Sequence, residues 1–109
     1  MKSSQAIAAL SALSQETRLA VFRDLVATGP QGKSAGKIAA KFKVAAPTLS
    51  FHLKELERAG LIAQRREGRS IIYAANYPAM RGLLSYLMED CCGGRPEICD
   101  IDIKACCAA

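Results

Sequence analysis

The chain has 109 residues, half of which are hydrophobic and 23% of which are charged. These values describe one globular domain with a modest core and exclude a disordered chain. No apolar run approaches the roughly 20 residues that a membrane span needs. The Ala-rich N-terminus also lacks the apolar stretch and cleavage site of a signal peptide. We therefore expect a cytoplasmic protein with no membrane partner.

Charge and cysteine content divide the chain near residue 90. Residues 1–88 hold 13 Lys and Arg against 5 Asp and Glu, whereas residues 89–109 hold 2 against 5. The cysteines all lie in the second part, at Cys91, Cys92, Cys99, Cys106 and Cys107. A basic body favours a polyanionic partner, and clustered cytosolic cysteines more often bind metal or act in redox chemistry than form a disulfide framework. We predict a domain over residues 1–90 and a metal-binding tail over residues 91–109.

Hydrophobic periodicity predicts two helices at the start of the chain. The first covers residues 3–12, and its apolar side consists of Ile7, Leu10 and Leu13. The second runs from Gln15 to about Ala27, with Ser14 as its N-cap. Its apolar stripe, which we expect in the core, consists of Leu19, Phe22, Leu25 and Val26. A turn over residues 28–32 follows, because this stretch is rich in Gly and Pro.

The next stretch, residues 34–60, predicts two helices joined by a tight turn. The first covers about Ser34 to Phe42, and the Ser34 hydroxyl can cap its N-terminus. The second starts near Ala46 and ends at Gly60, a residue type that suits the left-handed conformation that closes a helix. This arrangement is a helix-turn-helix.

The second of these helices has two unlike faces. One is an apolar stripe of Leu49, Leu53 and Leu56, which we expect in the core. The opposite face surrounds an aromatic ring with polar and basic groups, and consists of Pro47, Ser50, Phe51, Lys54 and Arg58. Such a face can enter the DNA major groove, where hydroxyls hydrogen-bond base edges, an apolar group touches a thymine methyl and cations meet phosphates. The alternative is an ordinary solvated face with one stray aromatic residue.

A lysine occurs at every fourth position along the helix predicted from Ser34 to Phe42. Lys33, Lys37 and Lys41 therefore line one of its sides, next to the polar face just described. They either solubilise the helix or contact phosphates.

After Gly60 the hydrophobic period changes from that of a helix to that of a strand. Residues 61–66 and 70–73 predict two strands, joined by a tight hairpin turn with Gly68 at a positive φ. The hairpin tip carries Arg65, Arg66 and Arg69. A helix-turn-helix followed by such a hairpin is a winged helix, an α+β fold that is mainly α with a small β-hairpin wing. An arginine-tipped wing can follow the DNA backbone or enter the minor groove.

A last helix is predicted from Asn76, its N-cap, to about Asp90. Its wide apolar face consists of Met80, Leu83, Leu84, Leu87 and Met88, and Tyr86 lies off that face. A helix this apolar must cover its own core or pair with another chain. Together with the first helix it favours a homodimer interface, and such dimers place two recognition helices about 34–36 Å apart, one DNA turn.

The thiols of the tail indicate a site for a soft metal. Cys91 and Cys92 follow the last helix and Cys99 comes seven residues later, which is not the spacing of a structural zinc site. Three sulfurs fit As(III) or Sb(III), whereas zinc would take a fourth ligand such as Cys106, Cys107 or a carboxylate. The alternative is a tail that binds no specific ligand or that only oxidises.

Three segments carry a resemblance to a known family: residues 13–19 (LSQETRL), 48–61 (TLSFHLKELERAGL) and 66–73 (REGRSIIY). They resemble the ArsR (SmtB/ArsR) family of winged-helix metalloregulatory repressors, over about residues 4–90. The resemblance implies a homodimer that represses a resistance operon and leaves its double-stranded operator DNA when a metal ion binds. The residues expected at the DNA are Lys37, Pro47, Thr48, Ser50, Phe51, His52, Lys54, Arg66 and Arg69.

The metal ligands depart from the two common patterns of that family. Residues 34–40 lack the Cys-x-Cys-like motif that some members carry on the third helix, and residues 79–89 lack the His ligands that others carry on the last helix. The set Cys91, Cys92 and Cys99 resembles instead a subgroup that responds to arsenic. The implied inducer is As(III), or Sb(III), with no organic cofactor. Cys106 and Cys107 are expected as auxiliary ligands or as surplus.

Other functions compete with an arsenic-responsive repressor. A thiol redox sensor would pair Cys91 or Cys92 with Cys99 or Cys106, and a repressor for another soft metal such as cadmium would use the same thiols. An arsenate reductase is disfavoured, because no Gly-rich anion loop lies next to a cysteine and no acid–base partner lies near the thiols. A metal scavenger would not need the basic winged-helix face. We predict a DNA-binding repressor and no enzyme activity.

Overall fold

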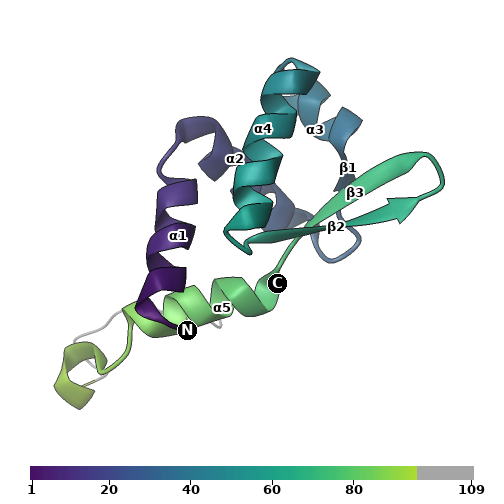
Figure 1. Cartoon of the computed structure of the whole chain (residues 1–109). Coiled ribbons are helices and arrows are strands. Elements are labelled where there is room, and N and C mark those ends of the chain that lie inside the picture. Colours follow the sequence, from purple (N-terminus) through teal and green to yellow (C-terminus); the bar gives the residue numbers. More distant parts are fainter. Residues whose placement is uncertain (96–109) are drawn as a thin grey trace.

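The computed structural model of the chain describes residues 1–95 and has the winged helix-turn-helix architecture predicted from the sequence (Figure 1). The elements, in order, are α1 (Ser3–Leu13), α2 (Glu16–Thr28), β1 (Lys33–Ser34), α3 (Ala35–Phe42), α4 (Ala46–Arg58), β2 (Ile62–Glu67), β3 (Ser70–Ala75), α5 (Tyr77–Leu87) and the short 3₁₀ helix η1 (Cys91–Gly94). Within this described part, no helix has the length and hydropathy required to cross a bilayer.

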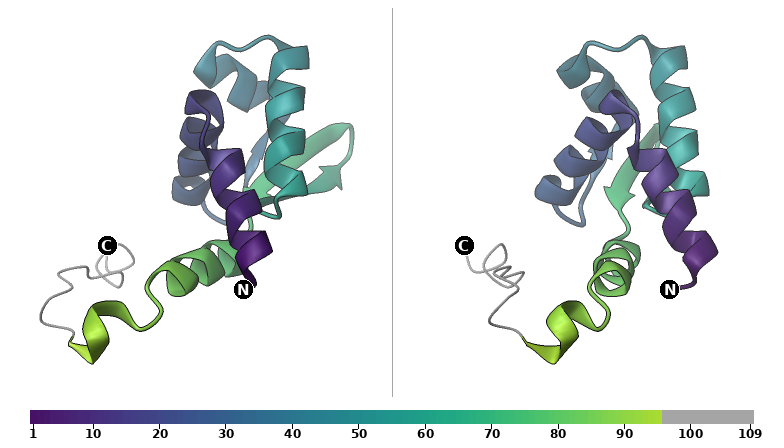
Figure 2. Two further views of the ribbon diagram at one scale, coloured as in Figure 1. Left: turned by 60° about the vertical axis from the view of Figure 1, so that its left-hand side comes forward. Right: turned by 90° about the vertical axis from the view of Figure 1, so that its left-hand side faces the viewer.

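Helices α1 to α4 form the body of the molecule, and the β2–β3 hairpin projects away from it (Figure 1). Helix α5 lies at the base of the body, beside the start of α1, and carries the chain away from the hairpin (Figure 2). The α3–α4 turn therefore lies at the end of the body opposite to α5.

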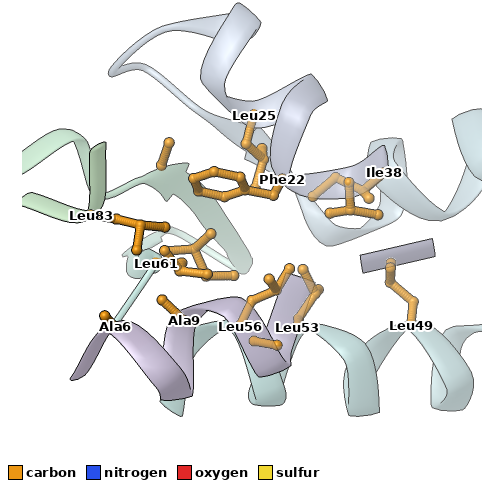
Figure 3. Packing of buried hydrophobic residues seen from close by; sticks show 14 residues of the cluster. Ala6, Ala9, Phe22, Leu25, Ile38, Leu49, Leu53, Leu56, Leu61 and Leu83 are labelled. Carbon is orange, nitrogen blue, oxygen red and sulfur yellow. The ribbon is translucent and has the colours of Figure 1, made fainter. Parts of the chain in front are cut away.

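The core lies where α1, α2, α3 and α4 meet the base of the hairpin (Figure 3). Its largest fully buried side chains are Val21, Leu25, Ile38, Leu49, Leu53, Leu56 and Leu61. The predicted stripe of Leu49, Leu53 and Leu56 is thereby confirmed. Because this stripe fixes the rotation of α4 about its own axis, it also decides which α4 side chains face solvent.

The sheet has three antiparallel strands in the order β1-β3-β2. Gly68 has a φ of +62° in the hairpin turn, as predicted. Strand β1 was not predicted, since two residues show no alternation. It is made possible by Gly32, which has a φ of +71° and lies so close to β3 that an added Cβ would be 2.4 Å from the Tyr73 carbonyl oxygen.

The N-caps of the helices agree with the prediction at two of three sites. The Ser34 hydroxyl accepts a hydrogen bond from the Lys37 backbone N–H, and the Asn76 side chain accepts one from the N–H of Ala79. The prediction that Ser14 caps α2 is wrong. The Gln15 side chain accepts from the Arg18 N–H at 2.8 Å, because Ser14 still belongs to the end of α1, where its hydroxyl donates to the Ser11 carbonyl.

The buried side of α1 is its alanine side, and of the predicted apolar residues only Leu13 packs against the core. Ala6, Ala9 and Ala12 are buried, whereas Ile7 and Leu10 are 64% and 45% exposed. Alanine allows α1 to approach the neighbouring helices closely, and this leaves the larger side chains facing outward. On α2 the prediction is also wrong for Leu19, which is 43% exposed, because Val21 is buried with Phe22 and Leu25 instead.

Helix α5 ends at Leu87, three residues before the predicted end. A turn follows in which Asp90 has a φ of +56°, and η1 begins at Cys91. Leu83 is buried, and Tyr86, predicted to lie off the apolar face, packs against the core. Leu84 and Leu87 are 36% and 56% exposed, so α5 covers the core with only part of its apolar surface.

Candidate nucleic-acid interface

The outer face of α4 carries the predicted set of polar, apolar and basic groups. Pro47, Thr48, Ser50, Phe51 and Lys54 are all exposed. Phe51 is the largest of the apolar side chains on this helix that face solvent, and 56% of it is exposed. Because Leu49, Leu53 and Leu56 hold the opposite face in the core, this surface has a fixed orientation relative to the body.

The α3–α4 turn presents the N-terminus of α4 at one end of the molecule (Figure 1). Lys43 adopts the left-handed conformation that ends α3, and the Val44 N–H donates to the Ala39 carbonyl. Ala45, the N-cap of α4, has no side chain that could accept from the first turn. The first N–H groups of α4 therefore lack a side-chain cap, and N–H groups at a helix N-terminus favour anionic partners such as phosphate.

His52 is not on the exposed face, which corrects its place among the predicted DNA contacts. The side chain is buried, with 9% of the residue exposed, and its Nδ1 lies 3.3 Å from Nη1 of Arg18. Burial and, secondly, the positive charge of Arg18 lower the pKa of His52. A guanidinium only donates, so Nδ1 accepts and the neutral ring carries its proton on Nε2. His52 thus connects α4 to the body.

The three lysines of the α3 side have different environments. Asp24 of α2 binds Lys33 at 2.8 Å and also binds Lys41. Burial alone would raise the pKa of Asp24, but hydrogen bonds and charges from the two lysines outweigh it and hold the pKa below its ordinary value. Lys37 is exposed and forms no ion pair within residues 1–95. Lys37 is therefore the best placed of the three to meet a phosphate.

The arginines of the hairpin also divide by environment. Arg65 pairs with Glu67 at 2.8 Å and donates to the carbonyls of Pro30 and Gln31, so it fastens the hairpin to the α2–β1 loop. Arg66 and Arg69 are exposed and form no ion pair with any residue that the structure describes. The wing thus has one structural arginine and two that face solvent.

The thiols lie partly outside the described residues. Cys91 is half-buried in η1, and Cys92 is the next residue of that helix. Cys99, Cys106 and Cys107 lie outside residues 1–95. Among residues 1–95, no group of three His, Cys, Asp or Glu side chains could hold a metal ion. The three-thiol site therefore stays a prediction.

The fold and the α4 face define the class of protein, a winged-helix DNA-binding regulator. A model of a helix-turn-helix domain family matches residues 13–65. The transcriptional repressor SdpR of Bacillus subtilis (strain 168) is 31% identical over 78 residues, which are 72% of this chain and 83% of that protein. YceK, an uncharacterized HTH-type transcriptional regulator of the same organism, is 41% identical over 59 residues. That match covers 54% of this chain and 58% of the length of YceK.

Solved structures show the same architecture. An ArsR-like transcriptional regulator from Rhodococcus sp. RHA1 has a TM-score of 0.72 with 24% identity, over 94% of this chain and 92% of that one. The homodimeric winged helix-turn-helix DNA-binding domain of Mb0332 from Mycobacterium bovis has a TM-score of 0.65 with 26% identity, over 80% and 81%. The chain belongs to the ArsR family of winged helix-turn-helix transcriptional regulators, which are DNA-binding proteins and not enzymes.

Proposed function

We propose that the protein is a homodimeric repressor of an arsenic-resistance operon, which leaves its operator DNA when As(III) or Sb(III) binds the thiolates of Cys91, Cys92 and Cys99. The observation that carries the proposal is the combination of an outward-facing α4 surface with a set of cysteines that begins at Cys91, after the turn that follows α5. That surface consists of Pro47, Thr48, Ser50, Phe51 and Lys54. The first feature binds DNA and the second senses the inducer.

At the DNA, α4 enters the major groove with Thr48, Ser50 and Phe51 towards the base edges. Lys37 and Lys54 contact phosphates on either side, and Arg66 and Arg69 of the wing contact the backbone or the minor groove. All of these side chains except Arg66 and Arg69 come from α3 and α4, so a single rigid helix pair positions them. The contacts to phosphate supply affinity, and those to bases supply sequence preference.

The dimer forms through α1 and α5. The start of α1 lies beside α5 at the base of the molecule (Figure 2), and the two helices leave four large apolar side chains exposed: Ile7, Leu10, Leu84 and Leu87. Burying the exposed part of such side chains against a second copy is favourable. Full burial of a fully exposed side chain contributes about 1.5–3 kcal/mol, and these partly exposed ones contribute roughly half of that. The relative from Mycobacterium bovis is homodimeric, which supports the same assembly here.

Arsenous acid, As(OH)₃, condenses with three cysteine thiols to form three As–S bonds and release three water molecules. Thiolate sulfur is a soft ligand and prefers soft, thiophilic ions. Cys91 and Cys92 supply two sulfurs from η1 and Cys99 supplies the third. The three As–S bonds close a loop of the chain between Cys91 and Cys99. This loop constrains the segment that follows α5, and α5 is part of the proposed dimer interface.

Coupling between the thiols and the DNA then runs through the interface. A coupling free energy of about 1–3 kcal/mol weakens DNA binding roughly 5–150-fold. The constrained segment shifts α5 against α1, and this changes the distance and angle between the two α4 helices of the dimer. If the distance between the two α4 helices no longer matches one turn of DNA, both helices cannot stay in the major groove.

Substitution of single thiols tests this assignment. Cys99→Ser should leave affinity for DNA unchanged and abolish release by arsenite, because only two sulfurs remain. The matched control is Cys106→Ser with Cys107→Ser, which should release normally. Release that survives in Cys99→Ser refutes the three-thiol site. Release by peroxide that a dithiol reverses, without any response to arsenite, would instead establish a redox sensor.

A further inference from the structure

Phe51 is an apolar ring in the middle of a polar surface. Its exposed neighbours on α4 are Pro47, Ser50 and Lys54, and 56% of the residue faces solvent. The side chain adds nothing to the core, which α4 already supplies with Leu49, Leu53 and Leu56. Because the ring has no role in the core and lies on the face proposed to bind DNA, a role in binding DNA would explain its exposure.

The ring is held in place by its neighbour in the sequence. The centroids of the Phe51 and His52 rings are 5.7 Å apart, with an angle of 60° between their planes, an edge-to-face contact. His52 is itself fixed by burial and by Arg18, at 3.3 Å from Nδ1. Phe51 thus has one ring contact, to a residue that is itself fixed, while 56% of it remains exposed to meet a partner.

The position of Phe51 on α4 suits contact with bases. It is the sixth residue of α4, which begins at Ala46, and the first residues of a recognition helix are the ones that approach base edges. A phenyl ring neither donates nor accepts a conventional hydrogen bond. The one apolar group that unmodified base pairs display in the major groove is the C5-methyl of thymine, whereas guanine, adenine and cytosine present donors and acceptors there.

We infer that Phe51 reads a thymine in each half-site of the operator by packing its ring against the C5-methyl. The inference rests on the proposed binding of DNA through α4. Against guanine or cytosine the ring would desolvate polar atoms without replacing their hydrogen bonds, so it selects against those bases. Phe51 then sets sequence preference at one base pair of each half-site, while Lys54, next to it, contributes affinity at any sequence.

Removing the methyl groups tests the inference directly. The DNA upstream of the protein's own gene is amplified once with thymidine triphosphate and once with deoxyuridine triphosphate, and both products are titrated with reduced full-length protein. The wild type should bind the uracil DNA more weakly, by about fourfold for each half-site. Phe51→Ala should show a clearly smaller difference in affinity between the two products than the wild type does, because the smaller side chain gives up most of the contact with the methyl group. Lys54→Ala, the matched control, should weaken binding to both and keep the wild-type ratio.

The outcomes separate the inference from the function on which it rests. If Phe51→Ala still distinguishes the two products as the wild type does, or if the wild type does not distinguish them, Phe51 does not read a thymine methyl, although DNA binding stands. If the wild type binds neither product at low salt, the proposed function fails and the inference with it. Low salt keeps the attraction to phosphates strong, so the ratio is measurable for both variants. Thermal unfolding of each variant checks that it is folded.

Discussion

Arg18 joins the end of α1 to the middle of α4 through His52. Its Nε donates to the Ala12 carbonyl at 2.7 Å, and its Nη1 lies 3.3 Å from Nδ1 of His52. One planar guanidinium thus contacts a helix of the proposed dimer interface and the helix that is proposed to meet DNA. This arrangement suggests both a pH dependence and a route of communication.

The first prediction concerns stability at acid pH. The pKa of His52 is lower in the folded protein than its ordinary value of 6.5, because burial and Arg18 disfavour the cation. As the pH falls below about 6.5, the unfolded chain binds a proton at His52 before the folded protein does. The free energy of unfolding should therefore drop, by at most about 1.4 kcal/mol per pH unit from this group. Well above pH 6.5 neither state binds a proton at His52 and the group contributes no slope.

Urea unfolding at pH 5.5 and 7.5 measures this drop in the wild type and in His52→Gln. Glutamine keeps an acceptor for Arg18 but does not titrate. The variant should lose less stability between the two pH values than the wild type. Equal losses in both proteins would show that His52 does not titrate on unfolding in this range.

A second prediction concerns communication between α1 and α4. In Arg18→Lys a single ammonium group replaces the planar guanidinium. It should not be able to bond the Ala12 carbonyl and the His52 ring at the same time. The variant should still bind DNA, but arsenite should release it about 2–30-fold less effectively, as expected for a loss of about 0.5–2 kcal/mol of coupling. Arg23→Lys, an exposed arginine on the same helix, is the control and should respond as the wild type does. Full release in Arg18→Lys would exclude this route.

The third prediction tests the turn that brings β1 against β3. Gly32→Ala should destabilise the fold, because alanine is strained at a φ of +71° and its Cβ would be 2.4 Å from the Tyr73 carbonyl oxygen. Strain of this kind costs about 1–3 kcal/mol. Gly36→Ala is the matched substitution in α3, where nothing lies within 4 Å of the added Cβ. It should stabilise the fold by about 0.5–1 kcal/mol. Thermal unfolding of the two variants should shift in opposite directions, and a Gly32→Ala protein as stable as the wild type would contradict the described turn.

A fourth prediction separates the wing arginines by role. In a variant with Arg66→Ala and Arg69→Ala, the slope of log affinity for DNA against log salt should become less steep, by about one for each phosphate that the wing no longer neutralises. The control is Arg81→Ala, an exposed arginine of α5, which should leave the slope unchanged. Helix α5 lies at the end of the body opposite to the α3–α4 turn (Figure 1). Equal slopes in the double variant and the wild type would remove the wing from the DNA interface.

Most of the fold was predictable because it depends on local signals. Several features depend only on residues nearby in the sequence. They are the stripe of leucines on α4, the caps at Ser34 and Asn76 and the turn at Gly68. The prediction failed where burial depends on distant neighbours. Ile7 and Leu10 are more hydrophobic than the alanines of α1, yet the alanines are buried, because the space available beside α1 decides the outcome.

The candidate site divides in the same way. The exposed set on α4 follows from helical geometry once the buried stripe is known. That His52 is buried does not follow, because its partner Arg18 is 34 residues earlier in the chain. The same holds for Arg65, whose partners Pro30 and Gln31 are brought close only by folding. The sequence does hold one signal for His52, its helical spacing of three residues from Leu49 and four from Leu56, which places a polar side chain beside the leucine stripe, where it needs a partner.

The most direct test of the whole account is fluorescence anisotropy of the reduced protein on labelled DNA from upstream of its own gene, with sodium arsenite titrated in and zinc chloride in a parallel sample. We predict that the complex forms at low salt, that arsenite dissociates it and that zinc does not. A complex that forms and ignores arsenite would contradict the proposed inducer and leave the family assignment intact.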